Sequence, residues 1–205
     1  MRLLIGSINP RRKSGLTFFF LLLPWALFSQ SVEPTGLAVG DVAPSFSAVD
    51  HQGVRVDLSQ TLNNGPVVLM FYRGVWCPYC NRQLKQMQDS ISFINQKGGT
   101  VIAVTPESVE QIQKTSKKSK ASFHIVHDQD LKIMEDYKVS YELEDATLQR
   151  YLRSGIDLQA YNGENGANLP VPATFVIGQD GKIVFAFFDP DYTKRATIQS
   201  ILQHL

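Results

Sequence analysis

A continuous apolar stretch at residues 66–72 (PVVLMFY) does most to limit what this chain can fold into. Such a run without alternation is typical of a strand covered on both faces, so the fold needs a sheet with helices on either side. Soon after it come the only two cysteines of the 205 residues, Cys77 and Cys80, with Pro78 between them. Proline suits the first position of a helix because its φ is fixed and it has no N–H. The sequence therefore predicts a buried strand, a short loop and a helix that begins at a C-x-x-C dithiol.

The rest of the chain alternates between predicted strands and helices. We expect strands at residues 54–58, 100–105, 123–127, 173–177 and 182–188, the last two joined as a hairpin by a Gln-Asp-Gly turn. We expect helices from Pro78 to about Gly98, at 108–119 with a Ser108–Gln111 capping box, at 131–137 and at 198–205. Residues 140–169 have no clean period, which predicts an insertion with little helix. This order predicts an α/β fold, a central mixed β-sheet flanked by helices, with an N-terminal extension and an insertion before the final hairpin.

The first 31 residues have the order of segments that is typical of a secretory signal peptide. Four basic residues come first, then an apolar run of 13 at residues 16–28, then small polar residues at 29–31. The apolar run is shorter than the roughly 20 residues that span a membrane. An uncleaved anchor is the alternative interpretation. We expect a cleaved leader at residues 1–31, hence an exported protein, periplasmic or extracellular, with no membrane attachment after cleavage.

Removal of this leader would leave a chain of one domain's length, with 16 basic and 19 acidic residues. A mildly acidic surface gives no electrostatic reason to expect nucleic-acid binding. The one basic patch, residues 114–120, is interpreted as a solvated helix end.

The position of the two cysteines points to redox chemistry. A disulfide across so short a loop would constrain the unfolded chain little, so a purely structural role explains it poorly. Cys77 falls at a helix N-terminus, where free N–H groups and a partial positive charge stabilise a thiolate. Cys80 lies one turn further on and can attack a sulfur bonded to Cys77. We expect a reversible Cys77–Cys80 disulfide, with Cys77 the more exposed and more acidic thiol and Cys80 the more buried one.

A metal site is the alternative use of two such cysteines, and it needs two more ligands. His124 and His127 are the candidates, but their spacing in a predicted strand points the two side chains to opposite faces. That geometry opposes a shared tetrahedral site. We therefore expect neither a metal nor another cofactor.

Several motifs carry a resemblance to a known family. WCPYC (residues 76–80) resembles the active site of thioredoxins and glutaredoxins. The wider chain is similar to the alkyl hydroperoxide reductase / thiol-specific antioxidant family, the peroxiredoxins, through the segments GDVAPSF (40–46), FYRGVWCPYC (71–80), PATFVIGQDGKIVFAF (172–187) and DPDYTKR (189–195). The resemblance covers residues 37–205 and implies a thioredoxin-like fold there.

The chain departs from the family's active-site pattern. Peroxiredoxins carry P-x-x-x-T-x-x-C, whose last residue attacks the peroxide; the matching positions here are Arg73, Cys77 and Cys80. Pro172 stands where an Arg often precedes the A-T-F strand. It matches instead the cis-proline that faces the dithiol in thioredoxins, and the resemblance implies a cis bond; a trans proline opening an edge strand is the alternative. Phe71 occupies the place of the buried acid of thioredoxins.

Two redox chemistries follow from the resemblance. A peroxidase would use Cys80 as the group oxidised to sulfenic acid and Cys77 to resolve it as a disulfide. A thioredoxin-like protein disulfide oxidoreductase would attack with Cys77 and resolve with Cys80. We favour the first chemistry, that of a thiol-dependent antioxidant oxidoreductase. The expected substrate is a peroxide or, in the alternative, a protein disulfide. The expected reductant is a thiol such as a thioredoxin-like protein.

The residues around the dithiol have two interpretations each. Arg73 either lowers a thiol pKa or is an ordinary surface residue at a strand end. Trp76 and Tyr79 shape the rim around the sulfur atoms, or Trp76 merely packs in the core. A third, non-enzymatic hypothesis is a partner-binding module that keeps this fold and makes contacts through residues 140–169. The intact dithiol speaks against it.

Overall fold

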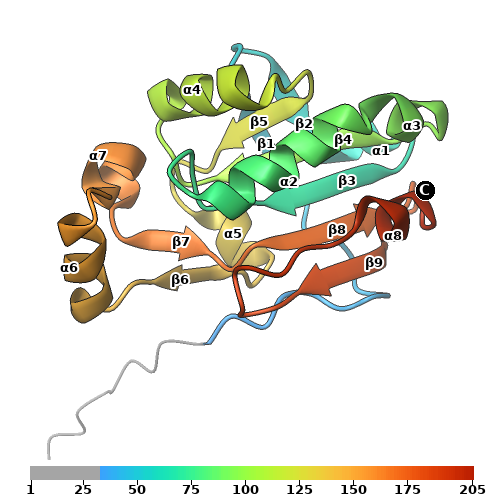
Figure 1. Ribbon diagram of the computed structural model, residues 1–205. Helices are drawn as coiled ribbons and strands as arrows, with labels where there is room; N and C mark the ends of the chain where they lie inside the picture. Colours follow the sequence, from blue (N-terminus) through green and yellow to red (C-terminus); the bar gives the residue numbers. More distant parts are fainter. Residues whose placement is uncertain (1–32) are drawn as a thin grey trace, which may run out of the picture. The chain divides into compact units, whose positions relative to one another are not determined.

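The computed structural model describes residues 33–205, and the leader expected at residues 1–31 lies outside them. Its central sheet has five strands in the order β5-β4-β3-β8-β9 (Figure 1). The strands β3 (Val67–Phe71), β4 (Thr100–Thr105) and β5 (His124–His127) run parallel to one another, while β8 (Ala173–Ile177) and β9 (Ile183–Phe188) add to β3 as an antiparallel hairpin. The predicted mixed sheet and its final hairpin are thus confirmed.

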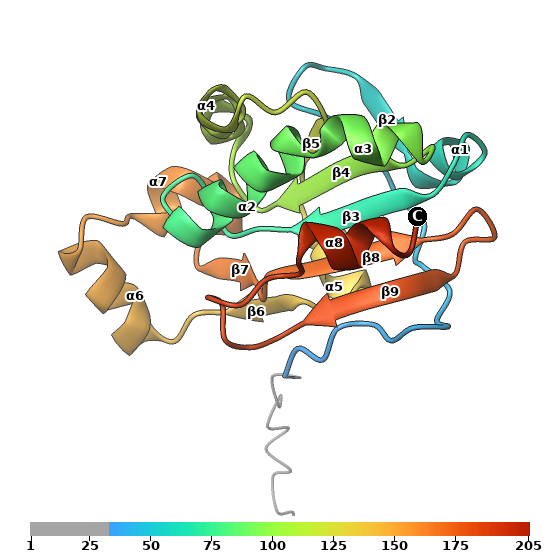
Figure 2. The same cartoon turned by 45° about the vertical axis from the view of Figure 1, so that its right-hand side comes forward.

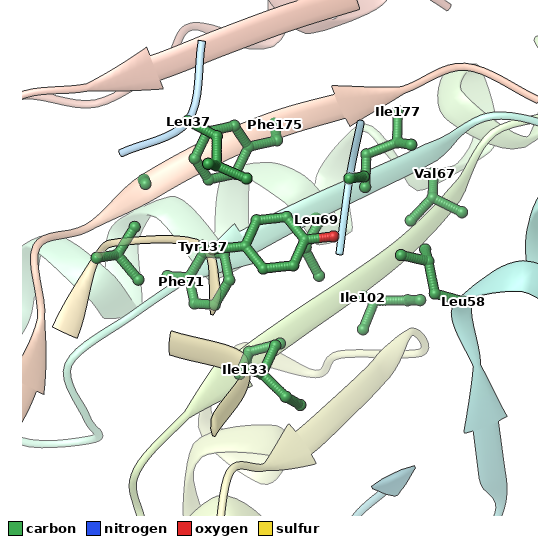
Figure 3. Close-up of a cluster of buried hydrophobic side chains, with 14 of the residues drawn as sticks. Leu37, Leu58, Val67, Leu69, Phe71, Ile102, Ile133, Tyr137, Phe175 and Ile177 are labelled. Carbon is green, nitrogen blue, oxygen red and sulfur yellow. The ribbon is translucent and has the colours of Figure 1, made fainter. Parts of the chain in front are cut away.

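Alternate side chains of β3 enter two different cores, as a strand covered on both faces requires. Val67, Leu69 and Phe71 join a cluster under α1 (Leu58–Leu62), α5 (Lys132–Asp136) and the N-terminal segment, part of which Figure 3 shows. Val68 and Met70 join the opposite cluster, which is covered by four helices: α2 (Pro78–Asp89), α3 (Ile91–Gln96), α4 (Val109–Ser119) and α8 (Ile198–Leu202). Figure 2 shows α2, α3 and α8 on the same side of the sheet.

Three local predictions need correction. The helix expected from Pro78 to Gly98 is two helices, because Ser90 (φ −103°, ψ 3°) ends α2 and precedes α3. Ser108 is the N-cap of α4, but its side chain makes no capping hydrogen bond, and the Gln111 side chain of the expected capping box is buried instead. The strand expected at 54–58 is the short β2 (Arg55–Asp57), which pairs with β1 (Ser47–Val49) outside the central sheet.

The insertion is more regular than the sequence predicts. It contains β6 (Ser140–Glu142), α6 (Asp145–Arg153), α7 (Leu158–Asn162), a 3₁₀ turn at Gly163–Asn165 and β7 (Asn168–Pro170), and β6 pairs with β7. A segment rich in glycine and asparagine is usually predicted to be a loop. Here, however, Asn165 is buried, and its Nδ2 donates to the backbone carbonyls of Pro106 (2.9 Å) and Asp128 (2.8 Å). These bonds tie the insertion to the loops that follow β4 and β5. Among residues 33–205 no helix is long and apolar enough to cross a membrane.

The expected cis bond at Pro172 is wrong, since residues 33–205 contain no cis peptide bond. The chain runs extended from one strand into the next: Val171 N–H donates to Val139 O at 2.8 Å, and β8 begins at Ala173, which pairs with Phe188. Pro172 is buried at the start of β8.

Candidate active site

The dithiol lies where the sequence predicts, between β3 and α2. Cys77 is the N-cap of α2 with extended backbone (φ −88°, ψ 111°), and Pro78 is the first helical residue. The Sγ of Cys77 accepts a hydrogen bond from the Cys80 backbone N–H at 3.4 Å. The first N–H groups of a helix have no backbone partner within the helix, and here the sulfur of the N-cap residue accepts a hydrogen bond from one of them.

Both cysteines are free thiols, and their sulfur atoms lie 2.7 Å apart. Cys77 was expected to be the more exposed thiol, but the difference is negligible, because both are buried: Cys77 is 1% and Cys80 0% exposed. The reason is an aromatic cover that comes from distant parts of the chain. Trp76 meets Tyr151 of α6 edge-on at 5.6 Å between ring centroids, and Tyr79 meets Tyr192 in the same way at 5.9 Å.

The acidity of the two thiols also differs from the expectation. Burial by itself would raise the pKa of Cys80, but the hydrogen bond with Cys77 and the positive charge of Arg195 lower it to about 6. The guanidinium Nη2 of Arg195 is 3.5 Å from the Cys80 Sγ. For Cys77, the hydrogen bond with Cys80 and then burial raise the pKa. The two sulfur atoms lie within hydrogen-bonding distance, so one proton can be shared between them.

Arg73 is a buried residue of the site, so its interpretation as a surface arginine is wrong. Its side chain is 2% exposed, and its guanidinium lies 4.9 Å from the ring centroid of Trp76 and 4.5 Å from that of Tyr192. It also donates a hydrogen bond to the Tyr151 hydroxyl. These aromatic faces stabilise a cation that no carboxylate pairs with in the described part of the chain. The positive charge of Arg73 acts to lower the pKa of Cys77.

Glu107 is a site residue that the sequence reasoning missed. Its buried carboxylate accepts hydrogen bonds from the backbone N–H of Val75 (2.6 Å) and from Thr115 Oγ1 (3.1 Å), which fixes the loop in front of the dithiol. Burial raises the pKa of Glu107 to about 7. The parallel pairing of β3 and β4 could have indicated this residue. The residues that follow two parallel neighbouring strands emerge at the same edge of the sheet, so Glu107 lies near the dithiol loop.

Arg195 was also missed as a site residue, although it ends the segment 189–195 that carried the resemblance. Its Nη1 donates to the backbone carbonyls of Tyr192 and Lys194, which orients Nη2 toward Cys80. An ion pair between Lys194 and Asp189 (3.0 Å) closes the same short loop. Two residues after Pro172, the Thr174 hydroxyl accepts a hydrogen bond from Gln83 Nε2 of α2 at 3.2 Å, which joins the start of β8 to α2.

Comparisons with known proteins agree with this geometry. Residues 39–186, more than half of the chain, match the AhpC/TSA family. The chain is 25% identical over 149 residues to the thiol-disulfide oxidoreductase ResA of Bacillus subtilis (72% of this chain, 66% of ResA). It is 26% identical over 103 residues to the peroxiredoxin Bcp of Escherichia coli (50% of this chain, 65% of Bcp). The matches thus span just under two thirds of the length of both relatives.

The fold has counterparts among solved structures. The crystal structure of the peroxidoxin BcpB from Mycobacterium tuberculosis superposes with a TM-score of 0.62 at 19% identity, covering 81% of this chain and 94% of that one. The likeness supports the predicted thioredoxin-like fold. By the span of the family match, the chain belongs to the AhpC/TSA family.

Proposed function

We propose that this protein is a thiol-dependent antioxidant oxidoreductase, peroxiredoxin-like, which reduces peroxides by cycling Cys77 and Cys80 between dithiol and disulfide. The observation that carries the proposal is the environment of Cys80, whose sulfur faces both the Arg195 guanidinium and the Cys77 thiol. A nucleophile for peroxide must be a thiolate, and a pKa of about 6 makes Cys80 mostly ionised at neutral pH.

The chemistry requires two steps at the dithiol. The Cys80 thiolate attacks one oxygen of the peroxide, the O–O bond breaks, and the departing alkoxide or hydroxide leaves with a proton as alcohol or water. Cys80 is then a sulfenic acid. The Cys77 thiol next attacks this sulfur, water leaves, and the Cys77–Cys80 disulfide forms. An external dithiol, such as a thioredoxin-like protein, returns two electrons and two protons by thiol–disulfide exchange.

The supporting residues have distinct roles in this proposal. Arg195 holds the Cys80 thiolate, and Arg73 favours ionisation of Cys77 when Cys77 attacks. Pro78 starts α2 so that the free N–H groups of the helix face the dithiol. Trp76 and Tyr79 hold the cover over the sulfur atoms, and Pro172 fixes the start of β8. The cysteine in place of the usual threonine leaves no hydroxyl to orient the peroxide, so we expect modest efficiency.

A reversible disulfide between Cys77 and Cys80 is the first expected result. Mild oxidation should give a species two hydrogen atoms lighter in mass, with the two cysteines joined in one peptide after digestion. Treatment with a dithiol reductant should restore the original mass. Two thiols that stay free after exposure to peroxide or a disulfide would contradict the proposal.

A thioredoxin-like protein disulfide oxidoreductase without significant peroxidase activity is the second candidate, and the similarity to ResA favours it. The burial of both sulfur atoms disfavours it, because a protein disulfide is bulkier than a peroxide and must reach the same sulfur. A binding module acting through residues 140–169 explains neither the shared proton of the dithiol nor the arginine beside it.

We further propose that the protein is exported, on the order of charged, apolar and small polar residues at 1–31. N-terminal sequencing of the protein recovered from the periplasm or medium should then begin near Val32. Protein that begins at Met1 and is extracted only by detergent would show that this segment is an anchor.

A further inference from the structure

A groove lies beside Cys80, between the exposed face of α2 and residues 193–198, which lead into α8. It encloses about 530 Å³ and is lined by Tyr79, Arg82 and Asp89 from one side and Arg195 from the other. Arg195 is shared: the side chain that lines the groove also places its Nη2 3.5 Å from the Cys80 sulfur. A ligand in this groove would therefore meet the same arginine that contacts the proposed nucleophile.

The groove is lined by two arginines, and no carboxylate pairs with either of them within residues 33–205. Every ion pair within residues 33–205 uses a lysine or His124, and none uses an arginine. Arg82 is exposed, with its guanidinium 5.9 Å from the ring centroid of Tyr79, and Arg195 bonds only to backbone carbonyls and to Cys80. The acidic residue of the lining, Asp89, already pairs with Lys85. Arg82 is thus left without an anion, and the anion beside Arg195 is the Cys80 thiolate itself.

We propose that this groove binds the carboxylate of an anionic organic hydroperoxide, held between Arg82 and Arg195 while its O–O group reaches Cys80. The inference rests on the proposed function and adds a substrate class to it. Arginine suits this role because its planar guanidinium binds carboxylates through two parallel hydrogen bonds. Since Cys80 is 0% exposed, the hydroperoxide reaches the sulfur when the Tyr79–Tyr192 part of the aromatic cover moves aside while Arg195 stays in place.

The first test does not depend on peroxidase activity. Iodoacetate and iodoacetamide differ only by a carboxylate in place of an amide, and both alkylate a thiolate with loss of iodide. The ratio of their second-order rate constants at Cys80, located by peptide mass mapping, should exceed the ratio for free cysteine by about threefold or more, as for one partly exposed ion pair. Arg82→Gln should bring the ratio back toward that of free cysteine.

Lys117→Gln is the matched control, because Lys117 is an exposed cation on α4 outside the groove and its loss changes the net charge equally. Its rate ratio should equal that of the unchanged protein. Equal effects of the two substitutions would show a general charge effect and overturn the proposal. Absence of alkylation at Cys80 by either reagent would overturn it as well.

The second test separates this inference from the proposed function. A hydroperoxide that bears a carboxylate is compared with its own methyl ester, and kcat/KM for the acid should be about threefold or more higher, with the preference lost in Arg82→Gln. Equal turnover of acid and ester would support the peroxidase function and contradict the proposed anion site. If neither the acid nor the ester is turned over but Cys80 still reacts preferentially with iodoacetate, the proposed peroxidase function is contradicted and the anion site is supported.

Discussion

Replacing Cys80 with serine should abolish peroxide reduction, lowering kcat/KM by about 10³-fold or more, the scale of effect seen when a nucleophile is removed. Cys80 is the thiol that Arg195 contacts, and its pKa of about 6 leaves it ionised at neutral pH. The hydrogen bond with Cys80 that raises the pKa of Cys77 is lost in this variant, but burial still raises it and Arg195 contacts position 80, so Cys77 is a poor replacement. The measurement is peroxide consumption by the reduced protein under excess external dithiol.

Cys77→Ser is the matched variant, since it removes the other sulfur of the same pair. In the absence of external thiol, it should consume one equivalent of peroxide per chain and then stop, because the sulfenic acid on Cys80 has no neighbouring thiol to form a disulfide with. The thioredoxin-like alternative expects another pattern. There Cys77→Ser abolishes attack on disulfides, and Cys80→Ser accumulates mixed disulfides with substrate proteins.

Replacing Arg195 with glutamine should raise the pKa of Cys80 by about 1–2 units, since an opposite charge close to an ionised group typically shifts its pKa by about 1–3 units. Thiolate reactivity is present above the thiol pKa and is lost as the pH falls through it. The midpoint of the rate-against-pH curve should therefore move from about 6 toward about 7–8, with a fall of about two- to tenfold in the rate at pH 7.

The pH dependence of alkylation by iodoacetamide at Cys80 measures this midpoint directly. Arg195→Lys keeps the charge and should shift the midpoint less, while Arg153→Gln removes an exposed arginine of α6 and should leave it in place. A lower rate with an unchanged midpoint would mean that Arg195 only supports the fold. Such a result would contradict its role at the thiolate.

The unit made of β3, the dithiol and α2 could be predicted because its signals are local. The apolar run, the C-x-x-C spacing and Pro78 all lie within a short stretch, and each local preference agrees with the next. The break at Ser90 was not visible, since the apolar face of the helix continues across it to Ile94. The regular insertion was missed because its order depends on buried amide hydrogen bonds of Asn165 to distant loops.

The electrostatics of the site could not be predicted from the same stretch. The arginine at Cys80 is 115 residues away in the chain, and the helix N-terminus by itself favours Cys77, so the local argument chose the wrong thiol. Arg73 follows a strand end, where exposure is usual, and its burial depends on Tyr151 and Tyr192 from other elements. The leader stays a prediction because residues 1–31 lie outside those described.

Peroxide is expected to oxidise the sulfur of Cys80. This is tested by treating Cys77→Ser protein with peroxide in the presence of a reagent that traps sulfenic acids, followed by mass mapping of the labelled residue. We expect a label on Cys80 that grows with peroxide concentration and is absent without peroxide. No label on Cys80, together with intact disulfide reductase activity of the unchanged protein, would contradict the claim and assign the chain to thioredoxin-like chemistry.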